Sequence, residues 1–145
     1  MPDDVAGSLR PSSRHVLGHR QHGVQRPGAA ERGRSHGLST IFLQSNKEGE
    51  LVEFLQEART GASAVILNAA AYTHTSVAIL DALQTLKQPV IEVHLSNPAR
   101  REDFRHLSYV AKAATGIIAG LGVNSYLLAI DAVAAILAGA PSKKK

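Results

Sequence analysis

The residues best suited to acid–base chemistry are an acid and a histidine in the segment VIEVH, which covers residues 90–94. Glu92 and His94 are two positions apart, and side chains two apart on a strand point to the same face. A carboxylate so placed can accept the proton of one imidazole nitrogen, which fixes the tautomer and leaves the other nitrogen for proton transfer. A histidine in a strand is also common as a hydrogen-bonded structural residue, so both interpretations stay open.

The residues that follow VIEVH in the sequence include groups that could bind an anion. Arg101 and Arg105 in REDFR are four positions apart and would share one face of a helix, from which a guanidinium can bind a carboxylate in a forked pair. The backbone amides of Leu95 and Ser96 follow the expected strand end and can bind an anion, as can a helix start near Thr75. The alternative for the two arginines is a solvated helix face.

The pattern from residue 38 onward predicts a scaffold for these groups. Short apolar runs predict strands over 39–44, 64–68, 90–94 and 115–119, and apolar periodicity predicts helices over 45–59, 75–86 and 124–137. A helical turn is expected over 101–106, and Ser45 with Glu48 fits a capping box. This alternation predicts an α/β doubly wound parallel sheet. Since ligands bind at the carboxyl ends of its strands, Asn68, His74 and His94 should meet at one edge.

Composition narrows the function classes. The chain has 145 residues, room for one domain, and no cysteine, which excludes a disulfide framework and thiolate metal sites. No apolar run approaches the roughly 18 to 20 residues that span a bilayer, and no signal-peptide pattern opens the chain, so we expect a cytoplasmic protein. The net charge of +4 arises from an arginine-rich start and a tail of three lysines, a distribution that argues against nucleic-acid binding.

Three blocks carry a family resemblance: NAAAYTHTSVAILDAL (68–83), VIEVHLSNPARREDFRHLSY (90–109) and ATGIIAGLGVNSYLLA (114–129). They resemble the type II 3-dehydroquinate dehydratases, and the resemblance covers about residues 30–140. It implies a flavodoxin-like fold with a five-stranded parallel sheet, and a lyase that dehydrates 3-dehydroquinate by anti elimination through an enolate. It also implies that no metal or cofactor takes part, and that trimers assemble into dodecamers.

The resemblance assigns catalytic roles to residues at matching positions. His94 would protonate the departing hydroxyl group, and Glu92 would orient His94.

The remaining positions would bind substrate. His74 and Arg105 would hold substrate hydroxyl groups, and Leu95 and Ser96 would hold the carboxylate. Asn68 would bind the substrate or an ordered water near the forming enolate, and Asp81 would reach the substrate of a neighbouring subunit. Arg101 would be structural.

The start of the chain departs from the family pattern. The family opens with a central strand and a loop that supplies an Arg and the Tyr that acts as the catalytic base. We therefore expect residues 1–29 to be an irregular segment, 30–140 to be the family-like domain, 141–145 to be a basic tail, and the sheet to be incomplete at its first strand. The segment 16–20 echoes a short part of the loop and nominates Arg20.

The chain has three tyrosines, and Tyr72, Tyr109 and Tyr126 all fall in other blocks. Without the base, two interpretations stay open. One is a lyase, and the other is a non-catalytic relative that keeps a carboxylate-binding site.

Overall fold

The computed structural model describes residues 15–19 and 26–139. In this part of the chain the strands are β1 (His15–His19), β2 (Ser39–Leu43), β3 (Ala64–Leu67), β4 (Val90–His94) and β5 (Gly116–Ala119). The helices are α1 (Arg26–Ser35), α2 (Glu48–Gly61), α3 (Val77–Gln84) and α4 (Asn124–Gly139). Three short 3-10 helices complete the elements: η1 (Ala70–His74), η2 (Pro98–Arg100) and η3 (Asp103–His106).

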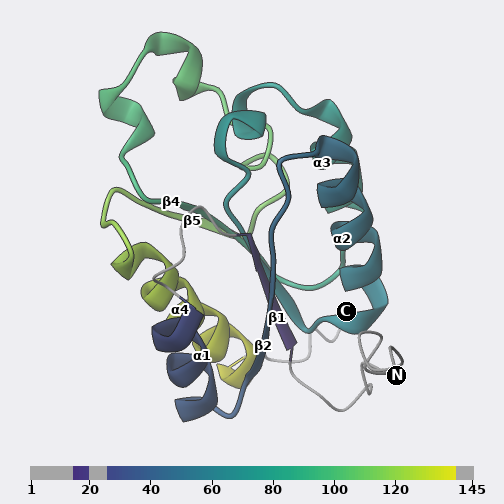
Figure 1. Ribbon diagram of the computed structural model, residues 1–145, viewed down its shortest axis with the longest axis vertical. Coiled ribbons are helices and arrows are strands. Elements are labelled where there is room, and N and C mark those ends of the chain that lie inside the picture. Colours follow the sequence, from purple (N-terminus) through teal and green to yellow (C-terminus); the bar gives the residue numbers. More distant parts are fainter. Residues whose placement is uncertain (1–14, 20–25, 140–145) are drawn as a thin grey trace.

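The strands form one parallel sheet in the order β2-β1-β3-β4-β5 (Figure 1). Helices α1 and α4 cover one face, and α2 and α3 cover the other. This order is that of flavodoxin-like doubly wound folds, whose switch point lies where the strand order reverses beside the first strand. The predicted fold class is confirmed.

The first strand, which we expected to be incomplete, lies inside the sheet between β2 and β3 and is as long as β2 and β4. β1 pairs with β2 from His15 to His19, but with β3 only through Val16–Gly18. Residues 15–19 are thus a strand and 26–29 begin α1, although we expected 1–29 to be irregular. HVLGH has little strand signal of its own, and pairing on both sides decides its conformation. The other parts of that segment and the 141–145 tail lie outside the described residues.

The start of α2 differs from the predicted capping box. The N-cap position is Lys47, and Ser45 lies before the helix with its hydroxyl hydrogen-bonded to Glu50. The backbone N–H of Lys47 donates to Ser45 Oγ at 2.9 Å, so Ser45 stabilises the turn that precedes the helix. Helix α3 also begins later than predicted, because Ser76 caps it by accepting a hydrogen bond from the N–H of Ile79.

Two apolar layers hold the sheet between the helices. Every residue of β3 and β4 is buried, as expected for strands covered on both faces. Helix α4 packs against the sheet and α1 through Tyr126, Ala129, Ile130 and Val133. Within residues 15–19 and 26–139, none of the helices has the length and apolar character needed to cross a membrane.

Candidate functional site

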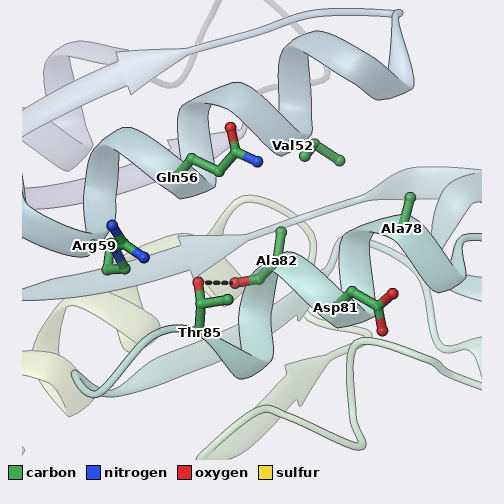
Figure 2. A pocket seen from close by; sticks show the side chains of 7 residues that line it. All are labelled: Val52, Gln56, Arg59, Ala78, Asp81, Ala82 and Thr85. Atoms are coloured by element: carbon green, nitrogen blue, oxygen red, sulfur yellow. Dashed lines mark hydrogen bonds between the residues drawn. The ribbon is translucent and has the colours of Figure 1, made fainter.

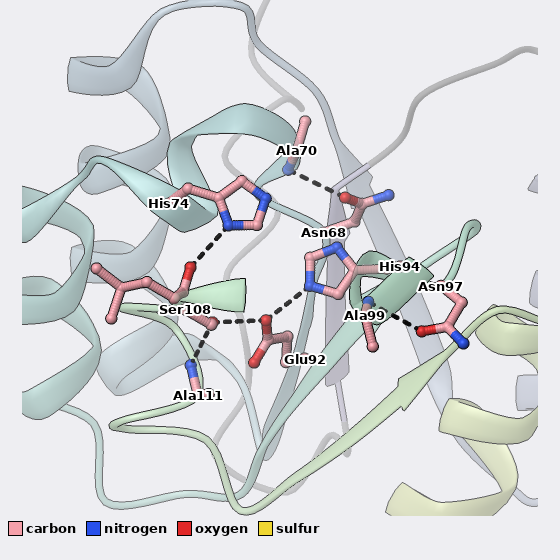
Figure 3. Close-up of polar contacts among 10 residues, drawn as sticks. Asn68, Ala70, His74, Glu92, His94, Asn97, Ala99, Ser108 and Ala111 are labelled. Atoms are coloured by element: carbon pink, nitrogen blue, oxygen red, sulfur yellow. Dashed lines mark hydrogen bonds and ion pairs between the residues drawn. The ribbon is translucent and has the colours of Figure 1, made fainter. Parts of the chain in front are cut away.

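A cavity of about 360 Å³ opens at the carboxyl ends of β3 and β4. Its walls combine the turn after β3 with the loop and 3-10 helices after β4 (Figure 3). The lining residues are Asn68, Ala70, Ala71, His74, His94, Leu95, Ser96, Pro98, Arg101 and Arg105. The three polar clusters of the sequence therefore meet in one place, as the strand-end argument predicted.

Glu92 and His94 form the pair that their spacing predicted. His94 Nε2 lies 2.6 Å from Glu92 Oε1, and the two residues are only 8% and 2% exposed. An ionised carboxylate can only accept hydrogen bonds, so it holds the hydrogen on Nε2. Nδ1, which Figure 3 shows on the side of Asn68, remains for a ligand. The histidine lines the cavity while its partner is enclosed beneath it.

His74 forms the opposite wall and is also fixed by one ring nitrogen. Its Nδ1 donates to the carbonyl oxygen of Leu107 at 2.7 Å, because a carbonyl can only accept. The rings of His74 and His94 lie nearly parallel, at an interplanar angle of 15° and a centroid separation of 6.5 Å. Two imidazoles of defined orientation thus line the same cavity.

Asn68 is held by a local turn. Its Oδ1 accepts a hydrogen bond from the N–H of Ala70 at 3.0 Å, an Asx-type turn that sets the carboxamide orientation. Ala70 adopts a left-handed backbone conformation with φ of 50°, which is uncommon for a residue with a Cβ.

The loop after β4 is held by the backbone that follows β5. The N–H of Gly120 donates to the carbonyl of His94 at 3.2 Å, and that of Gly122 donates to Leu95 at 3.0 Å. A Cβ on Gly120, where φ is 86°, would lie 3.1 Å from the Cβ of Asn97. The close approach of the two segments therefore requires glycine, and it fixes the loop that carries Leu95 and Ser96.

Arg101 and Arg105 both line the cavity and both interact with Glu102. Arg105 Nε donates to Glu102 Oε2 at 2.7 Å, whereas Arg101 Nε lies 3.7 Å from the same oxygen. The backbone N–H of Glu102 and the Arg105 guanidinium hold the pKa of that carboxyl below its ordinary value. Arg105 is thereby oriented through Nε, so its terminal nitrogens remain for a ligand carboxylate or hydroxyl. The i, i+4 pair forms no continuous helix face, since a break separates η2 from η3.

None of the three tyrosines, all of which are described, lines the cavity. The hydroxyl of Tyr72 donates to the carbonyl of Asn46 at 2.9 Å. Burial raises the pKa of Tyr126 to about 12, and its hydrogen bond with the Asn68 side chain opposes this by less. A phenol with that pKa stays protonated near neutral pH and is a poor base.

One predicted site residue, Asp81, lies away from the cavity. Asp81 lines a separate groove of about 590 Å³ between α2 and α3, together with residues that include Arg59 and Thr85 (Figure 2). Arg20 lies outside the described residues. Asp81 is therefore not among the residues that line the cavity of its own chain.

Sequence reasoning missed three groups that shape the site: the Leu107 carbonyl, the Ser108 hydroxyl and the strained turn at Ala70. Ser108 Oγ donates to Glu92 Oε1 at 2.7 Å. No periodicity links positions this far apart in the chain, so no spacing rule could have found the contact.

Comparison with known proteins covers most of the chain. The family model described as Dehydroquinase class II matches residues 12–134, a range that begins upstream of the boundary at residue 30. The 3-dehydroquinate dehydratase of Caulobacter sp. (strain K31) is 60% identical over 101 residues, which are 70% of this chain and 69% of that protein. The 3-dehydroquinate dehydratase of Phenylobacterium zucineum is 50% identical over 121 residues, or 83% of each chain.

Solved structures agree with the sequence matches. The type II dehydroquinase from Propionibacterium acnes is similar with a TM-score of 0.77 and 36% identity, covering 84% of this chain and 97% of that one. The type II dehydroquinase from Butyrivibrio crossotus has a TM-score of 0.79 at 31% identity, covering 84% and 98%.

Proposed function

Because this chain belongs to the class II dehydroquinase family, we propose that it is a hydro-lyase that converts 3-dehydroquinate to 3-dehydroshikimate. The observation that carries the proposal is the Glu92–His94 pair at a cavity that also contains Asn68, His74 and Arg105. A general acid must lie within hydrogen-bond reach of the leaving group, and His94 is the ring that Glu92 orients toward the cavity.

In the proposed reaction, a base removes the proton beside the ketone to form an enolate. The enolate electrons then form the C=C bond as the C–O bond breaks, and His94 donates a proton to the departing hydroxyl group, which leaves as water. Glu92 stabilises the positive charge of the protonated ring, since a buried carboxylate 2.6 Å away interacts strongly with an imidazolium. Asn68 binds the substrate or an ordered water near the oxygen of the forming enolate, where negative charge develops.

The remaining cavity residues hold the substrate. The backbone amides of Leu95 and Ser96, together with the Ser96 hydroxyl, bind its carboxylate, and Arg105 binds a ring hydroxyl. His74 binds a second hydroxyl through Nε2, because its Nδ1 is occupied by the Leu107 carbonyl.

Self-association is part of the proposal, because Asp81 lies outside the cavity. Val77 on α3 and Ile117 on the edge strand β5 are more than half exposed, at 52% and 56%, as apolar residues at subunit interfaces are in an isolated chain. Trimers that form dodecamers would bring Asp81 to the substrate of a neighbouring subunit. Analytical ultracentrifugation tests this, and a monomer at every concentration would contradict it.

A second candidate function is a non-catalytic relative that binds a carboxylated ligand. The position of the tyrosines favours it: none lines the cavity, and the pKa of Tyr126 is about 12. The lyase would then need a base other than these three tyrosines.

The formation of the conjugated enone, followed by its ultraviolet absorbance, separates the two functions. For the lyase we expect turnover that falls about a hundred- to ten-thousandfold in H94N, the usual contribution of a positioned acid. H36N is the matched control, because His36 Nε2 also bonds a carboxylate, Asp131 Oδ1 at 2.7 Å. His36 lies just before β2 and so near the amino end of the parallel sheet, whereas the cavity lies at the carboxyl ends of β3 and β4.

Binding of 3-dehydroquinate without turnover, measured by calorimetry, would support the non-catalytic relative instead. Neither binding nor turnover by a folded sample would overturn both.

A further inference from the structure

One short connection reaches both histidines of the cavity. The backbone carbonyl of Leu107 accepts from His74 Nδ1, and the next residue, Ser108, donates from Oγ to Glu92 Oε1, each at 2.7 Å. Glu92 in turn holds His94 (Figure 3). Of two adjacent residues after η3, Leu107 thus bonds the ring of His74 directly, and Ser108 bonds Glu92, the partner of His94.

The hydroxyl of Ser108 has a fixed direction. Its oxygen accepts a hydrogen bond from the N–H of Ala111 at 2.9 Å, so its single hydrogen is left for Glu92. A hydroxyl constrained at its acceptor side is a directed donor, whereas an unconstrained one would rotate among partners.

The two carboxylate oxygens of Glu92 differ in their hydrogen bonds. Oε1 receives both His94 Nε2 and Ser108 Oγ, while Oε2 is buried with no hydrogen-bond partner among the described residues. With 2% exposure, the carboxylate has little water to replace a lost donor. Ser108 therefore supplies the contact that keeps Oε1, and not Oε2, directed at the ring.

We propose that Ser108 is a positioning residue that fixes the Glu92 carboxylate and, through it, the Nε2–H tautomer and orientation of His94. The inference rests on the proposed function where it links this orientation to turnover. Ser108 does not line the cavity, so its removal should lower kcat and leave KM nearly unchanged.

The test uses the whole chain and nitrogen-15 and proton NMR of its histidine rings, which needs no turnover. In the wild type we expect the protonated-nitrogen signal of His94 at Nε2, with its proton shifted downfield by the carboxylate. S108A should lose or broaden that signal, S108T should restore it, and S108C, a weaker donor of similar size, should be intermediate. S108C and S108T also keep the test valid if S108A misfolds.

T115V is the matched control. Thr115 Oγ1 accepts from the N–H of Val90 at 3.1 Å, at the end of β4 away from the cavity. The T115V variant should leave the His94 ring signal unchanged, even if the stability of the protein falls.

In the kinetic arm, S108A should lower kcat about ten- to a hundredfold, the scale of losing a hydrogen bond to a charged group. An unchanged ring signal in a folded S108A protein would overturn the inference whether or not the chain is active. A changed signal restored by S108T would support it even if 3-dehydroquinate is not converted, in which case only the proposed function fails.

Discussion

Alkaline pH should destabilise this protein through the buried phenol of Tyr126. The residue lies in the first turn of α4 and is 6% exposed. Burial raises its pKa from 10.0 to about 12, which means that the fold prefers the neutral phenol over the phenolate. The Y126F variant removes the titrating group and keeps the ring.

The sign and size of the effect follow from this shift. Between pH 10 and 12 the unfolded chain releases the phenol proton and the folded chain retains it, so rising pH favours unfolding. A shift of about two units, at about 1.4 kcal/mol each, gives about 3 kcal/mol. This contribution is fully present below pH 10 and is lost as pH rises through the folded-state value of about 12.

Urea unfolding of the wild type and Y126F at a series of pH values measures the effect. The free energy of unfolding of the wild type should fall relative to that of Y126F as pH passes 10. Ultraviolet titration of tyrosinate should show a component with a midpoint near 12 that Y126F lacks. A stability difference that does not change with pH would refute the argument, and would also reopen Tyr126 as a candidate base.

Three further predictions concern single positions. The A70G variant should match or exceed the wild type in thermal stability, because the left-handed φ of 50° at Ala70 costs alanine about 1 kcal/mol. A large drop in Tm would show that the backbone at Ala70 is not strained. The free energy of unfolding in urea should fall by about 1 kcal/mol in the S76A variant, because Ser76 caps α3. The S76T variant keeps a capping hydroxyl and should keep most of that free energy. Equal losses in the two variants would show that the cap is not the cause. The Ser45 hydroxyl, and to a smaller extent Lys47, hold the pKa of Glu50 below the ordinary glutamate value. In the S45A variant, a carbon-13 NMR titration should therefore show the Glu50 midpoint at higher pH than in the wild type. An unmoved Glu50 midpoint would exclude that hydrogen bond.

The strands that position the site could be predicted from sequence because they are largely apolar runs, which is typical of strands buried on both faces. VIEVH forms β4 with the predicted bounds, and AVIL is buried along its whole length, because both strands are covered on two faces. The Glu92–His94 contact follows from the two-residue period of a strand, and the structure shows it at 2.6 Å.

Other features depend on tertiary contacts that no local pattern contains. β1 consists of HVLGH, and its place between β2 and β3 comes from pairing on both sides. The contacts of Ser108 with Glu92 and of Leu107 with His74 join residues 16 and 33 positions apart. Spacing rules reach only three or four residues along a helix or two along a strand, so such contacts require the folded chain.

The place of β1 also divides the molecule by role. β2 joins the sheet through β1 alone, and β1 joins β3 through only three residues, Val16–Gly18. Every described residue of the cavity comes from the chain after β3, beyond that narrow junction. Substitutions that weaken the pairing of β1 should therefore act chiefly on how firmly β2 is held to the strands that carry the cavity.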